Sequence, residues 1–223
     1  DVTSRALDKA ISETKNNDKQ KIKRKEILEK IKNILEADKL LYGNTDENEI
    51  MTASEIGLIT QKPMLAVFNI SETELTENWQ PDSTLKTKLG SIPYLAVPIA
   101  LEAMVADVTD SQEQSEIYEL AGITETALET LIKKSYQILG LITFFTTGED
   151  ETRAWTIPVD ATAPRAGRAI HSDFEEKFIR AEVIEWSKLL EAGSWSKARI
   201  LGWLRIEGKE YVVKDGDVVE FRI

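Results

Sequence analysis

The stretch GLITFFTTGEDETRAWTI, residues 140–157, decides the fold, because strand-length apolar runs replace helical periodicity there. Leu141 to Thr146 has the length and composition of a strand, and Arg153 to Ile157 alternates as a second strand. Gly148-Glu149-Asp150 between them is a turn signal. Two such runs around a glycine-containing turn predict a β-hairpin.

Short strands separated by turn residues continue to the end of the sequence. The runs with strand length are Phe178 to Ile184, Leu204 to Ile206, Tyr211 to Val213 and Val218 to Ile223. The second and third of these flank Glu207-Gly208-Lys209, which predicts that they pair as another hairpin. Thr162-Ala163-Pro164 is a helix start with Thr as the N-cap, and Trp186 to Glu191 is a helix that ends at Gly193. Two hairpins with a helix packed between them predict a β-grasp fold for residues 140–223.

Residues 61–139 have a different pattern, in which apolar runs alternate with helices. Met64 to Phe68 and Tyr94 to Ile99 are continuous apolar runs, typical of strands buried on both faces of a parallel sheet. The helical stretch Ser83 to Leu89 lies between them, so the segment predicts a βαβ unit. Ser111 to Gly140 predicts two further helices. We therefore expect part of an α/β domain here.

Residues 1–60 predict a helical hairpin followed by a linker. Apolar residues recur at helical spacing on both sides of Asn16-Asn17-Asp18, which breaks the pattern and predicts a turn between two antiparallel helices. The pattern of residues 43–61 predicts a polar loop with a short amphipathic helix. Because Asp1 to Ile11 already resembles the inside of a helix, we expect the chain to be a piece of a longer protein.

The composition excludes several kinds of site. The 223 residues are 42% apolar and 30% charged, which is typical of a globular protein. With no cysteine and a single histidine, His171, the sequence has no disulfide framework and no thiolate or histidine metal cluster. No apolar run approaches the ~20 residues that span a bilayer. We expect a cytoplasmic monomer with no membrane partner.

The net charge of −11 argues against a surface that is basic throughout, so any contact with RNA must be local. Basic residues cluster just after the predicted helical turn, and the candidates for partner contact there are Lys21, Lys23, Arg24 and Lys25. A solvated helix face is the simpler interpretation, and an RNA-contacting arm is the alternative.

Several stretches are similar to the YchF/Obg-like ATPase family, which belongs to the TRAFAC class of GTPase-like proteins. They are GLITFFTTGEDETRAWTI (140–157), TAPRAGRAIHSDFEEKFIRAEVI (162–184), LLEAG (189–193), LRIEGKEYVVKDGDVVEFR (204–222) and, upstream, KPMLAVFNISE (62–72). The resemblance implies three parts in chain order. They are the family's helical insertion (1–60), the rear part of a P-loop-type nucleotide-binding domain (61–139) and a TGS domain of β-grasp fold (140–223).

The resemblance also implies a nucleotide-base site. GTPases place Asn-Lys-x-Asp at the end of a buried strand, and the family has Asn-x-x-Glu there, which matches Asn69, Ile70 and Glu72. A strand-end turn with a helix cap is the alternative explanation of this pattern. The family's second base-contacting loop corresponds to Ala100 and Leu101, without its usual Ser. The implied ligand is ATP or GTP with Mg²⁺.

The phosphate-binding half of such a site is missing from these 223 residues. No GxxxxGK[ST] loop occurs, and the nearest stretch, GWLRIEGK (202–209), has one residue too many, with Glu210 in place of Ser or Thr. We therefore expect the chain alone to hydrolyse no nucleotide and to bind it weakly.

The predicted TGS region contains no catalytic set. His171 lies two residues before Asp173, and either a structural hydrogen bond or an acid–base role fits this spacing. The candidates for RNA or partner contact in this region are Arg153, Arg165, Arg168, Lys177 and Arg180. Three hypotheses remain open: a ribosome- or RNA-binding module, an ATPase completed by an N-terminal half, and a degenerate structural fragment.

Overall fold

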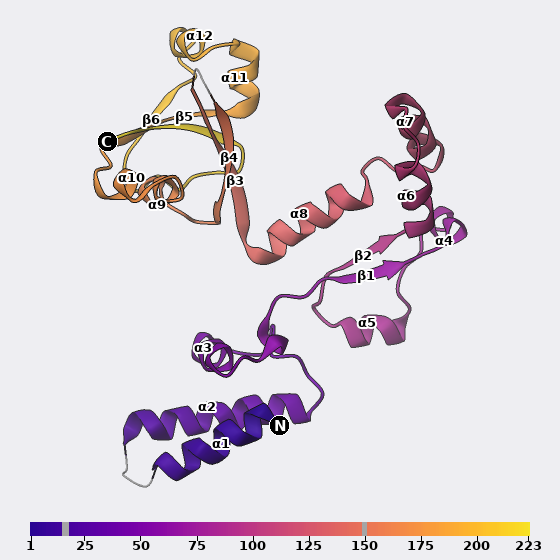
Figure 1. Cartoon of the computed structure of the whole chain (residues 1–223), viewed down its shortest axis with the longest axis vertical. Coiled ribbons are helices and arrows are strands. Elements are labelled where there is room, and N and C mark those ends of the chain that lie inside the picture. Colours follow the sequence, from indigo (N-terminus) through magenta and orange to yellow (C-terminus); the bar gives the residue numbers. More distant parts are fainter. Residues whose placement is uncertain (15–17, 149–150) are drawn as a thin grey trace. The chain divides into compact units, whose positions relative to one another are not determined.

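The computed structural model describes residues 1–14, 18–148 and 151–223, and these form two compact units. Unit 1 is Asp1–Ala127 and unit 2 is Leu128–Ile223. The predicted fold class is confirmed, with a helical N-terminal part, a parallel βαβ element and a C-terminal mixed sheet of five strands (Figure 1). No helix in the described ranges is both long and apolar enough to cross a bilayer.

Unit 1 begins with two helices that lie side by side, α1 (Val2–Glu13) and α2 (Lys19–Glu36) (Figure 1). Asp18 caps α2 by accepting from the Gln20 N–H at 2.9 Å, whereas Asn16 and Asn17 of the predicted turn lie outside the described residues. Leu28 is completely buried between the two helices. A third helix, α3 (Glu47–Glu55), packs against α2 and is followed by the 3-10 turn η2 (Ile59–Gln61).

The rest of unit 1 is built around two parallel strands, β1 (Ala66–Asn69) and β2 (Tyr94–Val97). Their connection contains α4 (Glu72–Thr76) and α5 (Ser83–Leu89), and two helices follow β2: α6 (Ile99–Ala106) and α7 (Ser111–Leu120). The next helix, α8 (Ala127–Leu139), lies in unit 2 from Leu128 onward. The βαβ prediction is confirmed. The prediction of strands buried on both faces is wrong, because β1 pairs with β2 alone among the described strands and Val67 is 49% exposed. Ile99, predicted as the end of a strand, instead begins α6.

Unit 2 contains the hairpin of β3 (Leu141–Thr147) and β4 (Thr152–Pro158), which confirms the prediction for residues 141–157. Glu149 and Asp150 of the predicted turn lie outside the described residues. The other strands are β5 (Arg180–Glu185), β6 (Arg205–Glu207) and β7 (Asp217–Arg222). The sheet order is β4-β3-β7-β5-β6, with β3 and β7 parallel at its centre, the β-grasp arrangement.

A short turn ties β7 to β3. The Thr143 N–H donates to Asp215 Oδ1, and the Gly216 N–H donates to the Thr143 carbonyl, both at 2.8 Å. These bonds extend a parallel pairing that joins β3 and β7 directly at Phe145 and Val218.

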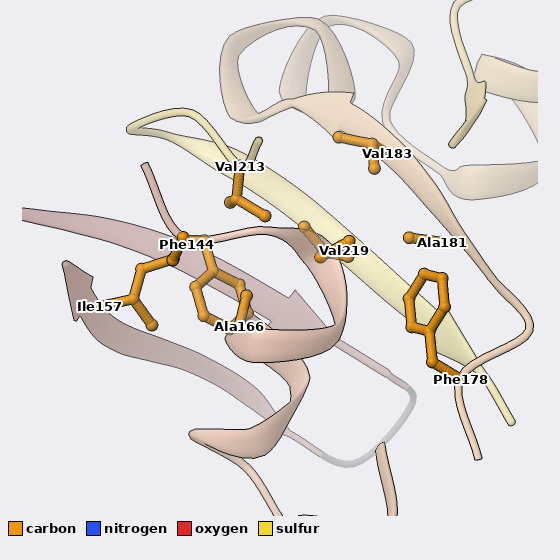
Figure 2. Close-up of a cluster of buried hydrophobic side chains, with 10 residues drawn as sticks. Phe144, Ile157, Ala166, Phe178, Ala181, Val183, Val213 and Val219 are labelled. Carbon is orange, nitrogen blue, oxygen red and sulfur yellow. The ribbon is translucent and has the colours of Figure 1, made fainter. Parts of the chain in front are cut away.

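Helices cover both faces of this sheet. One face carries α9 (Ala163–Arg168) and α10 (Ser172–Glu176), and the other carries α11 (Trp186–Ala192) and α12 (Trp195–Ile200). Figure 2 shows side chains from β3, β4, α9, β5 and β7 converging on the first face. The labelled members of this cluster are Phe144, Ile157, Ala166, Phe178, Ala181, Val183, Val213 and Val219, all of them buried. Burial of this many apolar side chains is the main stabilising contribution in unit 2.

The predicted hairpin between Leu204–Ile206 and Tyr211–Val213 is wrong. β6 pairs antiparallel with β5, and the later segment lies against residues 161–163. Two backbone hydrogen bonds hold it there, from the Ala163 N–H to the Tyr211 carbonyl at 2.8 Å and from the Val213 N–H to the Ala161 carbonyl at 3.0 Å.

A buried carboxylate explains where that segment goes. The Tyr211 hydroxyl donates to Asp217 Oδ2 at 2.6 Å, and Arg205 donates to Asp217 Oδ1 at 3.2 Å. Asp217 is buried at the start of β7, so this carboxylate draws both partners toward the central strand. Burial raises the pKa of Tyr211, and its hydrogen bond to Asp217 raises that pKa further, so the phenol remains a donor at neutral pH.

Candidate functional site

The predicted base-contacting residues lie at the carboxyl end of the two-stranded sheet in unit 1. The parallel register pairs Asn69 with Val97, so both strands end at the same edge. Beyond that edge the Ile70 N–H donates to the Val97 carbonyl at 3.0 Å. Asn69 is exposed and Ile70 is buried, so the motif offers the Asn69 amide to solvent while Ile70 anchors the loop. Ligands of open α/β sheets characteristically bind at this end of the strands.

The residue after Ile70 builds a helix cap. The Ser71 hydroxyl accepts from the Glu74 N–H at 3.2 Å, and Glu74 accepts from the Ser71 N–H at 2.8 Å, which is a capping box for α4. The backbone hydrogen bond from Ser71 and then its hydroxyl lower the pKa of Glu74, with burial as a weaker opposing effect. Glu74 rather than Glu72 therefore completes the cap. Glu72 is exposed, and neither its side chain nor that of Asn69 makes a hydrogen bond within the described ranges.

The second predicted base loop is the first turn of a helix. Ala100 and Leu101 are the second and third residues of α6, which follows Pro98 directly. The Leu101 side chain is buried and Ala100 is exposed, so this segment offers a ligand its backbone N–H groups. Those N–H groups have no intrahelical acceptor in the first turn, and they carry the positive end of the helix dipole.

The basic residues of α2 have mixed surroundings. Arg24 forms an ion pair with Glu55 of α3, and Lys25 lies 3.3 Å from Glu29 on its own helix. Lys21 and Lys23 form no ion pair among the residues that the structure describes. The first two turns of α2 therefore leave two of the four predicted cations available to a partner.

The five predicted basic residues of unit 2 come from different elements, and most have partners. The Arg153 guanidinium stacks 4.3 Å above the Trp155 ring. Arg168 pairs with Glu175 and Lys177 with Asp173, each at 2.8 Å. These carboxylates raise the pKa of both cations, and Lys177 lowers the pKa of Asp173. The two remaining residues are Arg165, exposed on α9, and Arg180, at the start of β5.

Comparisons with known proteins identify the family. Residues 141–223 match the family described as "YchF-GTPase_C: Protein of unknown function (DUF933)". The chain is 38% identical over 213 residues to "Ribosome-binding ATPase YchF" of Bacillus subtilis (strain 168), covering 93% of this chain and 58% of that protein. It is 35% identical to the protein of the same name from Haemophilus influenzae, covering 100% and 61%. The chain belongs to the YchF/Obg-like ATPase family.

A solved structure of the YchF/Obg-like family has the same fold. "Structure of the Schizosaccharomyces pombe YchF GTPase" superposes with a TM-score of 0.82 at 25% identity, covering 99% of this chain and 61% of that one. The chain spans about three-fifths of the length of the relatives it matches. This likeness in fold extends over 99% of the chain.

His171 caps a helix in this YchF/Obg-like chain. It is the N-cap of α10, and its Nδ1 accepts from the Asp173 N–H at 3.2 Å. The ring nitrogen Nδ1 acts as the acceptor in this cap. In the described part of the chain no three His, Cys, Asp or Glu side chains form a potential metal site.

The structure also assembles a basic cluster that the YchF/Obg-like resemblance and the sequence pattern did not indicate. Arg199 and Arg222 join Arg180 around the carboxylate of Glu182. Arg199 is on α12 and Arg222 ends β7, so these residues are separated by 19 and 42 positions from Arg180 along the chain. The cross-strand register of β5 with β7 brings Arg180 and Arg222 together, and Arg199 reaches Glu182 from α12, so no local motif could have signalled the cluster.

Proposed function

We propose that this chain is the partner-binding portion of a YchF-type ATPase, that it acts in the cytoplasm and that it binds the ribosome or RNA. Sequence similarity to relatives named "Ribosome-binding ATPase YchF" carries this proposal. Lys23 on α2 and Arg165 on α9 are exposed, and Lys21 on α2 is half-buried. These cations support the proposal, because cations without acidic partners can neutralise RNA phosphates.

Ribosome binding is tested by sedimenting the chain with purified ribosomes through a sucrose cushion at low and high salt. We expect co-sedimentation that falls as salt rises. The double variant Lys21→Glu/Lys23→Glu should reduce it, whereas the matched control Lys86→Glu/Lys88→Glu, on α5, should not. Equal co-sedimentation of both double variants and the parent chain would remove the α2 surface from the proposal.

The same proposal gives the chain half of a nucleotide pocket. Asn69 and Glu72 would meet the polar edge of a base, Ile70 and Leu101 would fix the loop backbones, and the Ala100 N–H would donate to a base acceptor. The exposed Asn69 and Glu72 side chains fit this task, because both lack partners among the described residues. ATP or GTP with Mg²⁺ needs phosphate contacts in addition, and the 223 residues contain no GxxxxGK[ST] loop to supply them.

A complete ATPase, formed when an N-terminal half supplies the phosphate loop, is the second candidate function. The common edge at which Asn69 and Val97 end favours it over a degenerate fragment, because a structural remnant has no need of an exposed polar motif there. Calorimetry of ATP and GTP binding with Mg²⁺, on the chain and on Asn69→Ala, separates these hypotheses. Asn48→Ala, on α3, is the control. Binding that Asn69→Ala abolishes and Asn48→Ala retains would favour the ATPase.

A further inference from the structure

Three arginines from three elements of unit 2 meet around one buried carboxylate. The Glu182 side chain is only 9% exposed, and Arg199 Nη2 donates to its Oε2 at 2.5 Å. Arg222 Nε lies 3.5 Å from Glu182 Oε1, and Arg180 Nη2 lies 3.9 Å from the same oxygen. The three arginine side chains are themselves 43–59% exposed. We call Arg180, Arg199 and Arg222 the arginine triad.

The register of the sheet places two members of the triad, Arg180 and Arg222. Arg180 is directly opposite Arg222, and Glu182 is directly opposite Glu220, so all four side chains share one face of the β5–β7 ladder. Glu220 forms an ion pair with Arg222, whose Nη2 lies 3.0 Å from Glu220 Oε1. Three guanidiniums therefore face two carboxylates. Each guanidinium has five N–H donors in a planar fork, so most of these donors remain available to an added anion.

An exposed aliphatic residue adjoins the triad. Ile206 on β6 is directly opposite Glu182 on β5, so its side chain lies on the same face, and it is 72% exposed. The tryptophans nearest in sequence to Arg199, Trp195 and Trp203, instead pack against the buried cluster of this face. Single-stranded RNA is bound with exposed aromatic rings that stack on bases, which an isoleucine cannot replace. Arginine beside an exposed apolar side chain is typical of protein interfaces.

We propose that the arginine triad and Ile206 form a docking site for an acidic protein segment, with two or more carboxylates and an aliphatic side chain. The carboxylates bind the guanidinium forks in the bidentate geometry that arginine favours, and the aliphatic side chain covers Ile206. Charge complementarity selects this partner, because the triad is locally positive in a chain with a net charge of −11. The proposal is independent of ribosome binding, since it uses none of the cations on α2.

Fluorescence polarisation of a labelled peptide of alternating Glu and Leu, titrated with the full chain, tests this site. We expect binding that weakens as salt rises and that Arg180→Ala or Arg222→Ala weakens about fivefold or more. Ile206→Ser should weaken the Glu-Leu peptide but not an oligo-glutamate peptide of equal charge. Lys214→Ala, which removes an exposed cation just before β7 and outside both proposed sites, is the matched control and should leave binding unchanged. Equal affinities for all four variants and the parent chain would overturn the proposal.

Oligouridylate RNA of equal charge is the second probe. Tighter binding of this RNA than of the peptide, with the same dependence on Arg180, would assign the triad to nucleic acid and overturn the proposal. Arg180 is the primary position because it has the longest contact with Glu182, so its loss disturbs the fold least.

Methyl NMR of the unsubstituted chain provides a measurement that needs no variant. The peptide should shift the Ile206 signal and leave that of Ile59, on η2 in unit 1, in place, and the reverse pattern would contradict the site.

Discussion

The two sheets of this chain differ in how far they bury the side chains of their strands. In unit 1, β1 has the sequence AVFN, and Val67 is 49% exposed. In unit 2, β5 has the sequence RAEVIE, and Val183 is 0% exposed although the strand has charged residues at both ends. β5 lies between β7 and β6 with helices on both faces, whereas β1 pairs only with β2 among the described strands.

Burial of a strand is therefore a property of the layers around it rather than of its own composition. A run of apolar residues shows that a strand can be buried on both faces, but neighbouring strands and covering helices must be present to bury it. The same difference should appear in stability. Unit 2 should respond strongly to changes in its core, and the sheet of unit 1 should respond weakly.

The largest expected effect is that of Phe144→Ala, which empties a fully buried position on β3. The lost burial and the resulting cavity should destabilise unit 2 by about 3–5 kcal/mol. Val67→Ala, on the exposed side of β1, should change stability by no more than about 0.5 kcal/mol. Urea unfolding with hydrogen exchange resolved by peptide measures each unit separately. Similar losses in the two variants would break the comparison.

A smaller effect is expected from Gly167→Ala in α9. An added Cβ would lie 2.9 Å from the Phe174 Cβ and 3.3 Å from the Phe174 carbonyl oxygen, so α9 and α10 would have to separate. We expect a loss of about 1–3 kcal/mol by overpacking. Gly208→Ala, where an added Cβ meets no atom within 4 Å, is the control and should be nearly neutral. Thermal unfolding followed by circular dichroism would measure both, and an unchanged midpoint for Gly167→Ala would show that this face is loosely packed.

Acidification should affect the two units differently through two glutamates. Burial raises the pKa of Glu182, but Arg199 and Arg222 together outweigh it, so the pKa in the folded chain is lowered. A lowered folded pKa contributes stability above the unfolded pKa, and this stability is lost as pH falls through the folded value. Glu182→Gln should therefore be less stable than the parent chain at pH 7. This difference in the free energy of unfolding should narrow as pH falls below the ordinary pKa of glutamate.

The pKa of Glu74 in unit 1 is also lowered, so acidification should again reduce stability. The effect on overall stability should be smaller, because the Glu74 capping box belongs to a five-residue helix on the surface. Urea midpoints of the parent chain, Glu182→Gln and Glu74→Gln, taken at neutral and at acidic pH, measure the difference. The stability difference between Glu182→Gln and the parent chain should narrow as pH falls. A difference that widens instead would contradict the conclusion that the arginines lower the pKa of Glu182.

The smallest effect concerns two helix caps. Ser71 caps α4 in unit 1, and Ser194 caps α12 in unit 2 by accepting from the Lys197 N–H at 3.2 Å. Replacing either serine by Ala should cost about 1 kcal/mol locally. Because α12 packs onto a buried cluster, Ser194→Ala should also lower the global stability of unit 2, whereas Ser71→Ala should only increase exchange of the α4 amides. A global effect of Ser71→Ala would show that α4 is coupled to its sheet.

Pairing between strands that are neighbours in the chain can be predicted from the sequence, whereas pairing between distant segments cannot. The β3–β4 hairpin was predictable because its strands are joined by a short turn that sets their pairing. The sequence pattern pairs Tyr211 to Val213 with the nearest strand in the chain, whereas the Tyr211 hydroxyl donates to a buried carboxylate, Asp217. Attraction to a buried group at a distance leaves no periodic signal in the sequence.

The candidate sites show the same limit. Asn69 was placed at a strand end by its apolar run, and its strand does end there. The start of α6 at Ile99 was missed because Pro98 lies between an apolar strand and an apolar helix, so hydrophobicity does not change at the boundary. The arginine triad could not be predicted, because it depends on the register of β5 with β7 and on the packing of α12 near Glu182.

The parallel pairing of β3 with β7 has a consequence for how unit 2 is made. β7 is the last of its strands in chain order, and it occupies the centre of the sheet between β3 and β5. During synthesis the β3–β4 hairpin and β5 cannot join into one sheet until β7, Asp217–Arg222, has been made, because β7 lies between them. Pairing β7 with β3 closes the long stretch of chain between them, so this final step is slow relative to formation of the β3–β4 hairpin. Until then the unpaired edges of β3 and β5 are exposed to other chains, so unit 2 is most prone to aggregation just before its synthesis is complete.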